Sequence, residues 1–114
     1  MAVRTDAAMP LTCSFRDHVK ARIKSDPEFR RALFQEATQS WIEGDAGTAR
    51  MVLRAYINAT IGFEKLAAAT GTPVKSLMRM FGPSGNPTAA NLSEVIRVLQ
   101  KKTGVHLEVR ASAA

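Results

Sequence analysis

Residues 62–81, GFEKLAAATGTPVKSLMRMF, constrain the fold of this chain more than any other stretch. Their pattern predicts two short helices joined by a tight turn at Gly71, because glycine ends a helix readily in the left-handed conformation. The small Ala67 lets the second helix cross close to the first, and Leu77 can anchor the second helix in the core. Such a unit commonly presents its second helix to the major groove of DNA, although an ordinary helical hairpin can share the spacing.

Short polar residues precede four runs of apolar residues at helical spacing, and such side chains cap the free N–H groups of a first helical turn. The expected caps are Ser14, Asp26 and Thr88, a further helix is expected to begin around Asp45, and the matching stop signals are glycines at 44, 62 and 104. The signals predict helices from 14, from 26 to about 43, from 45 to 62 and from 88 to 104. The residues expected to face inward on the last three are Phe29, Leu33, Ala37, Trp41, Ala49, Val52, Leu53, Tyr56, Ile57, Leu92, Val95, Ile96 and Leu99.

The chain is expected to be all-α and to divide into four parts. Residues 1–13 lack periodicity and are expected to form a flexible tail, and residues 14–43 a helical arm. Residues 44–104 are expected to form a helical bundle, in which Thr72 caps the second helix of the central unit and residues 82–87 form a loop. The alternation of VHLEVR in residues 105–110 predicts either a short strand, which would pair across a dimer axis or with another protein, or an ordered extension lying on the bundle.

The composition favours a polyanionic partner. The 114 residues contain 16 Lys and Arg against 10 Asp and Glu, which gives a net charge of +6 and an isoelectric point near 10.1. We expect a cytoplasmic protein without membrane attachment, because there is no long apolar run or signal peptide and Cys13 is the only cysteine. His18 and His106 are too far apart in sequence to suggest a metal site, and no catalytic grouping is visible. We therefore expect no cofactor and no enzymatic activity.

The second half of the chain carries a combination of residues that resembles a known family. The matching segments are Glu43-Gly44-Asp45, Leu66-Ala67, Thr70-Gly71, Ser76-Leu77, Gly85-Asn86-Pro87 and a helix with Leu92, Val95 and Leu99 before Gly104. Over roughly 60 residues the chain is similar to Xre/Cro-like helix-turn-helix proteins, and among these to the addiction module antidote proteins, which are antitoxins. One departure is Phe63, at a position where that family often has Thr or Ser, so that only backbone N–H groups could bind a phosphate there.

This resemblance implies a lambda-repressor-like helix-turn-helix bundle and a sequence-specific repressor of its own operon. Such a repressor acts as a homodimer on a pseudo-palindromic operator of double-stranded DNA, and it is often encoded beside a RelE-like toxin that it binds. Carried over to this chain, the recognition pattern places Val74, Lys75 and Arg79 at the major groove. Arg79 can bind guanine O6 and N7, and Lys75 can bind a base or a phosphate.

Short polar side chains near this unit suit contacts to phosphate oxygens: Ser76, Ser84 and Asn86. Each site residue also has an ordinary explanation, since Lys75 and Arg79 can be solvated surface charges and Asn86 can simply begin the turn before Pro87. The same holds for the basic residues of the arm, which form either a solvated face or a partner-binding surface: Arg16, Lys20, Arg22, Lys24, Arg30 and Arg31.

Two other functions remain open at this point. The chain could be a protein-interaction module that neutralises a toxin with little DNA binding, using the arm and the C-terminal segment, or it could be a stand-alone transcriptional regulator. A small enzyme would need an acid and a base from carboxylates such as Glu36 and Glu43, which are expected to face solvent.

Overall fold

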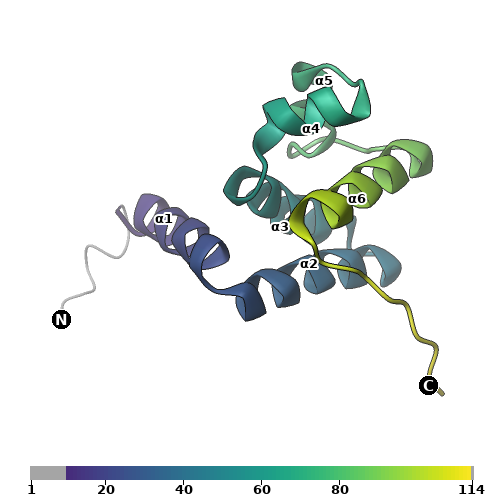
Figure 1. Cartoon of the computed structure of the whole chain (residues 1–114), viewed down its shortest axis with the longest axis horizontal. Coiled ribbons are helices and arrows are strands. Elements are labelled where there is room, and N and C mark those ends of the chain that lie inside the picture. The colour runs from purple at the N-terminus through teal and green to yellow at the C-terminus, as the bar shows by residue number, and fades with distance from the viewer. Residues whose placement is uncertain (1–9, 114) are drawn as a thin grey trace.

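The structure is a computed structural model, and it describes the backbone of residues 10–113 and the side chains of residues 17–113 (Figure 1). Six helices follow one another in this part of the chain. They are α1 (Pro10–Ser25), α2 (Pro27–Ile42), α3 (Ala46–Ala59), α4 (Gly62–Thr70), α5 (Val74–Met80) and α6 (Ala89–Thr103). Helices α2 and α5 lie at opposite ends of the molecule, and α3, α4 and α6 lie between them. The all-α prediction is therefore confirmed for the described residues.

Three of the predicted helix starts are confirmed by their hydrogen bonds. The Asp26 carboxylate accepts from the backbone N–H groups of Glu28 and Phe29, both at 3.1 Å. The Phe29 N–H bond lowers the pKa of the Asp26 carboxyl below its ordinary value. Asp45 accepts from the N–H of Thr48 and Thr88 from that of Asn91, each at 3.1 Å. These bonds satisfy N–H groups that have no partner within the helix.

Three predicted boundaries differ from the structure. Helix α1 already begins at Pro10, so Ser14 is not its cap, and only residues 1–9 of the predicted tail lie outside the described residues. Gly62 does not close the third helix, which ends at Ala59; with φ of +81° Gly62 begins α4 instead. Thr72 does not cap α5, because Pro73 follows it in an extended conformation (ψ 145°) and is itself the residue before the helix. Because Pro73 is not yet helical, Thr72 lies one residue too far from the first turn of α5 to cap it.

A single buried cluster joins all six helices. Phe34 and Ala37 of α2 share it with Tyr56 of α3, and the rings of Phe34 and Tyr56 stack with centroids 4.6 Å apart. Phe34 and Val98 are 0% and 4% exposed although neither was expected to face inward, whereas Phe29, Leu33 and Trp41, which were expected to, are only partly buried. There is thus no core boundary between residues 14–43 and residues 44–104.

The C-terminal segment forms an extension rather than the alternative strand. Residues 104–113 have no regular structure, and no strand is present elsewhere in residues 10–113 with which they could pair. The segment is held by Val105 and Leu107, which pack against the core, and by the Leu107 N–H, which donates to Gln100 Oε1 at 2.8 Å. The apolar–polar alternation therefore corresponds to one side of the segment, with Val105 and Leu107, packing on the bundle.

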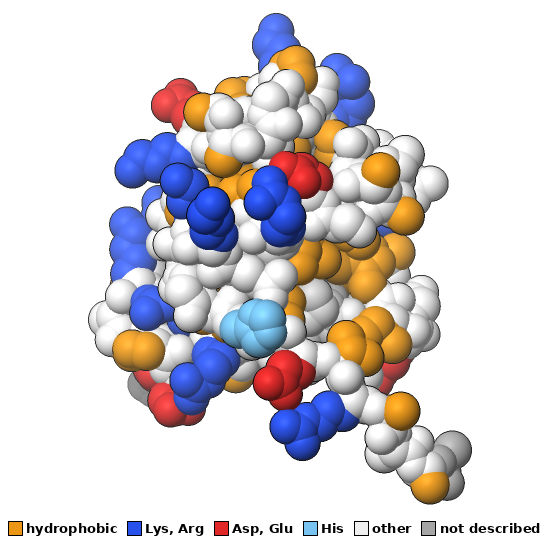
Figure 2. Space-filling model, turned by 45° about the vertical axis from the view of Figure 1, so that its right-hand side comes forward, with side chains coloured by type: hydrophobic (Ala, Val, Ile, Leu, Met, Phe, Trp, Pro, Cys, Tyr) orange, Lys and Arg blue, Asp and Glu red, His pale blue; other side chains and the backbone are white. Residues whose placement is uncertain are grey.

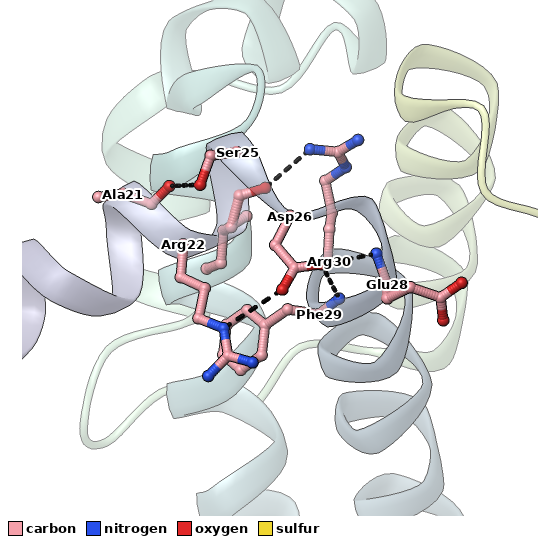
Figure 3. Close-up of polar contacts among 8 residues, drawn as sticks. Ala21, Arg22, Ser25, Asp26, Glu28, Phe29 and Arg30 are labelled. Atoms are coloured by element: carbon pink, nitrogen blue, oxygen red, sulfur yellow. Dashed lines mark hydrogen bonds and ion pairs between the residues drawn. The ribbon is translucent and has the colours of Figure 1, made fainter.

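Polar contacts fix the angle between α1 and α2 (Figure 3). Arg30 donates from Nη1 to the Ile23 carbonyl at 2.7 Å and so caps the end of α1, while Asp26 caps the start of α2. Arg22 donates to Asp26 at 3.4 Å and lies 4.5 Å from the centre of the Phe29 ring. Two of the basic residues of the arm, Arg22 and Arg30, therefore have a structural role at this junction.

Candidate nucleic-acid interface

Helices α4 and α5 and the turn between them form a short, firmly anchored pair. Gly71 ends α4 with φ of +75°, and its N–H donates to the Ala67 carbonyl at 2.8 Å. This is the left-handed helix end that the sequence predicts. Leu77 is 1% exposed and fixes the middle of α5, and the buried rings of Phe63 and Phe81 lie 6.4 Å apart beneath its end. The core thus sets the orientation of α5.

Two cations lie exposed on the side of α5 that is not buried. Lys75 and Arg79 are four residues apart and therefore share a helix face. Neither takes part in an ion pair with any residue whose side chain is described. Val74 is partly buried and packs against the core, so it lies at the margin of this face, and Ser76 is also partly buried.

The loop of residues 82–87 is bound tightly to the end of α5. The Gly82 N–H donates to the Arg79 carbonyl at 3.1 Å, and the Gly85 N–H donates to the Gly82 carbonyl at 3.0 Å. A Cβ atom on Gly85 would overlap the carbonyl oxygens of Arg79 and Met80, so this position requires glycine for packing.

Ser84 and Asn86 are exposed on this loop, and neither side chain hydrogen-bonds to another described residue. The loop is held by Arg50 of α3, whose Nε donates to the Gly82 carbonyl at 3.2 Å and whose Nη2 donates to the Pro83 carbonyl at 3.1 Å. Sequence reasoning missed Arg50, since nothing within α3 indicates a contact more than 30 residues away. Arg50 thus holds in place the loop that carries Ser84 and Asn86, which follows α5 directly in the chain.

The stretch of sequence that contains α5 carries charge of one sign. No Asp or Glu occurs between Glu64 and Glu94, a stretch that includes Lys65, Lys75 and Arg79. Figure 2 shows Lys and Arg side chains over the upper and left parts of one face, with few acidic side chains among them. A surface of this kind attracts polyanions and its attraction weakens as salt increases.

Two open hollows have volumes of about 370 and 540 Å³, and the larger is lined by Ile61, Lys65, Ala68, Ala69 and Lys102. Among the residues searched, no group of three His, Cys, Asp or Glu could hold a metal ion. None of the described helices is both long enough and apolar enough to span a membrane.

Comparisons of the chain with protein-family models, curated proteins and solved structures give no match. The class that the fold defines is therefore an all-α protein with an exposed cationic helix, and the finer family assignment is a proposal.

Proposed function

We propose that the protein is a sequence-specific DNA-binding repressor with a lambda-repressor-like helix-turn-helix, and that it is the antitoxin of a type II toxin–antitoxin module. The observation that carries the DNA-binding part is the arrangement of α5. Leu77 holds the helix to the core while Lys75 and Arg79 extend from its exposed side without ion-pair partners among the described residues. An Arg side chain in this position can form two hydrogen bonds to a guanine, and an exposed Lys can bind a phosphate.

In this proposal some of the candidate residues read bases and the others bind the phosphate backbone of the DNA. Arg79 would read guanine, Val74 could contact a thymine methyl group, and Lys75 would bind a base or a phosphate. Ser76, Ser84 and Asn86 would bind phosphate oxygens; the last two are exposed on the loop that Arg50 holds. Two copies of the chain would present their α5 helices about 34 Å apart to successive major grooves of a pseudo-palindromic operator.

The direct test is a titration of the purified protein with a duplex covering the promoter of its own gene and with a scrambled duplex. Arg79→Ala should cost about 1–3 kcal/mol on the preferred duplex and relax the preference at one base pair. Lys75→Ala should weaken binding to both duplexes equally if Lys75 contacts a phosphate. For Lys75→Ala, the slope of log affinity against log salt concentration should then be smaller by about one unit.

Arg31→Ala is a matched control. Arg31 is exposed on α2, at the end of the molecule opposite to α5, and it pairs with Glu28 at 2.7 Å. This variant should bind both duplexes as the wild type does. If Arg79→Ala behaves like Arg31→Ala in affinity and in sequence preference, Arg79 does not read DNA.

The antitoxin part depends on the family resemblance and has its own test. Coexpression with the product of a neighbouring RelE-like gene should give a stable complex and relieve the toxicity of that gene. A protein that binds its promoter but forms no such complex would be a stand-alone regulator. One that forms the complex without binding DNA would be a toxin-neutralising module.

A further inference from the structure

A second pair of cations lies on α3. Arg50 and Arg54 are four residues apart, and both are partly exposed. Arg50 holds the carbonyl groups of Gly82 and Pro83 through Nε and Nη2. The Nη1 atom of Arg54 lies 3.8 Å from the position that a Cβ atom on Gly82 would take. Two guanidinium groups therefore flank the buried backbone at the start of the loop.

Neither guanidinium is paired with a carboxylate of residues 17–113. The ion pairs among the described side chains do not include Arg50 or Arg54. The nearest acidic residue in α3 or its cap is Asp45, whose carboxylate caps the helix through the Thr48 N–H. A guanidinium has five N–H donors in a planar fork, so Arg50 keeps donors free after binding two carbonyl groups. Two neighbouring positive charges without a counter-charge favour the binding of an anion.

We propose that Arg50, Arg54 and the loop of residues 82–85 form a binding site for a backbone phosphate of duplex DNA. Arg54 is the phosphate-contacting residue, and Arg50 is a positioning residue that holds the loop against the end of α5. This inference rests on the proposed DNA-binding function and adds to it a contact from α3. The loop carries the exposed Ser84 and Asn86 and follows α5 directly, so a duplex bound at Lys75 and Arg79 would pass next to it.

The first test compares Arg54→Gln with Arg31→Gln in DNA titrations over a range of salt concentrations. We expect Arg54→Gln to lose affinity several-fold for the promoter duplex and for the scrambled duplex alike, with a salt slope lower by about one unit. Arg54→Lys keeps the positive charge and should recover most of the slope. Arg31→Gln should be unchanged, and circular dichroism of each variant establishes that it is folded.

The second test uses inorganic pyrophosphate as a probe and does not require DNA binding. Its addition should shift the amide NMR signals of Gly82, Ser84 and Gly85 in the wild type and in Arg31→Gln, but not in Arg54→Gln. If the wild type binds no DNA while these shifts occur, the proposed function fails but the anion site stands. If Arg54→Gln keeps both the salt slope and the pyrophosphate shifts of the wild type, the inference is overturned.

Discussion

Replacement of Gly85 by alanine tests the packing of the loop that carries two of the candidate phosphate contacts. Gly85 does not have a positive φ, so the left-handed conformation is not the reason for glycine there. The reason is the close approach of the carbonyl groups of Arg79 and Met80, which occupy the place of a Cβ atom. Because both obstacles are backbone atoms at the end of α5, no side-chain rotation can relieve the overlap.

The loop must therefore move, and its hydrogen bonds determine the cost. Displacement breaks the bond from the Gly85 N–H to the Gly82 carbonyl and weakens the two bonds from Arg50. Overpacking costs about 1–3 kcal/mol, and each lost bond adds about 1 kcal/mol, with more for a charged donor. We expect a total of about 4 kcal/mol. This is a large part of the about 5–15 kcal/mol by which such domains are stable.

Urea denaturation followed by circular dichroism measures this effect, with Gly71→Ala as the matched control. Gly71 has φ of +75° but nothing within 4 Å of a Cβ atom, so alanine there meets only the left-handed penalty of about 1–2 kcal/mol. With a slope of about 1.5 kcal/mol per molar urea, the midpoint should fall by about 2.5 M for Gly85→Ala and by about 1 M for Gly71→Ala. An equal or smaller fall for Gly85→Ala would refute the close-approach argument.

Three further substitutions test the packing and the caps. Leu77→Ala removes a side chain that is 1% exposed and should cost about 2–5 kcal/mol in urea denaturation, with loss of DNA binding when α5 is released. Tyr56→Phe removes the bond between the Tyr56 hydroxyl and Thr103 Oγ1 (3.0 Å) and should cost about 1 kcal/mol at neutral pH. Burial raises the pKa of Tyr56 above 10.0, so wild-type stability should fall as pH rises past 10.0, and the fall should be smaller in Tyr56→Phe. The Phe29 N–H lowers the pKa of Asp26, so the stabilisation by this carboxylate is present above pH 3.8 and is lost as pH falls through the lower folded pKa. Asp26→Asn should therefore have a lower melting temperature than the wild type at neutral pH, and this difference should shrink in acid.

The ends of the elements could be predicted where they depend on neighbouring residues. Asp26, Asp45 and Thr88 each cap a helix through a backbone N–H two or three residues away. Gly71 and Gly104 end helices in the left-handed conformation, with φ of +75° and +77°. These bonds and backbone angles are local, so a short stretch of sequence is sufficient to predict them.

Only part of the candidate site could be predicted from the sequence. The exposure of Lys75 and Arg79 opposite Leu77 follows from helical periodicity and agrees with the structure. The contribution of Arg50 and the packing reason for Gly85 could not be predicted, because each depends on a segment brought close by folding.

The sequence by itself determined the helical class, the helix starts at Asp26, Asp45 and Thr88, the turn at Gly71 and the cationic face of α5, because these follow from periodicity and from interactions within a few residues. Tertiary structure decided that Phe34 and Val98 are buried and that the arm shares one core with the bundle. It also decided that the VHLEVR segment packs as an extension, because no second strand lies within the described chain to supply its hydrogen bonds. Burial and strand pairing depend on partners that are distant in the chain, and only the folded arrangement specifies those partners.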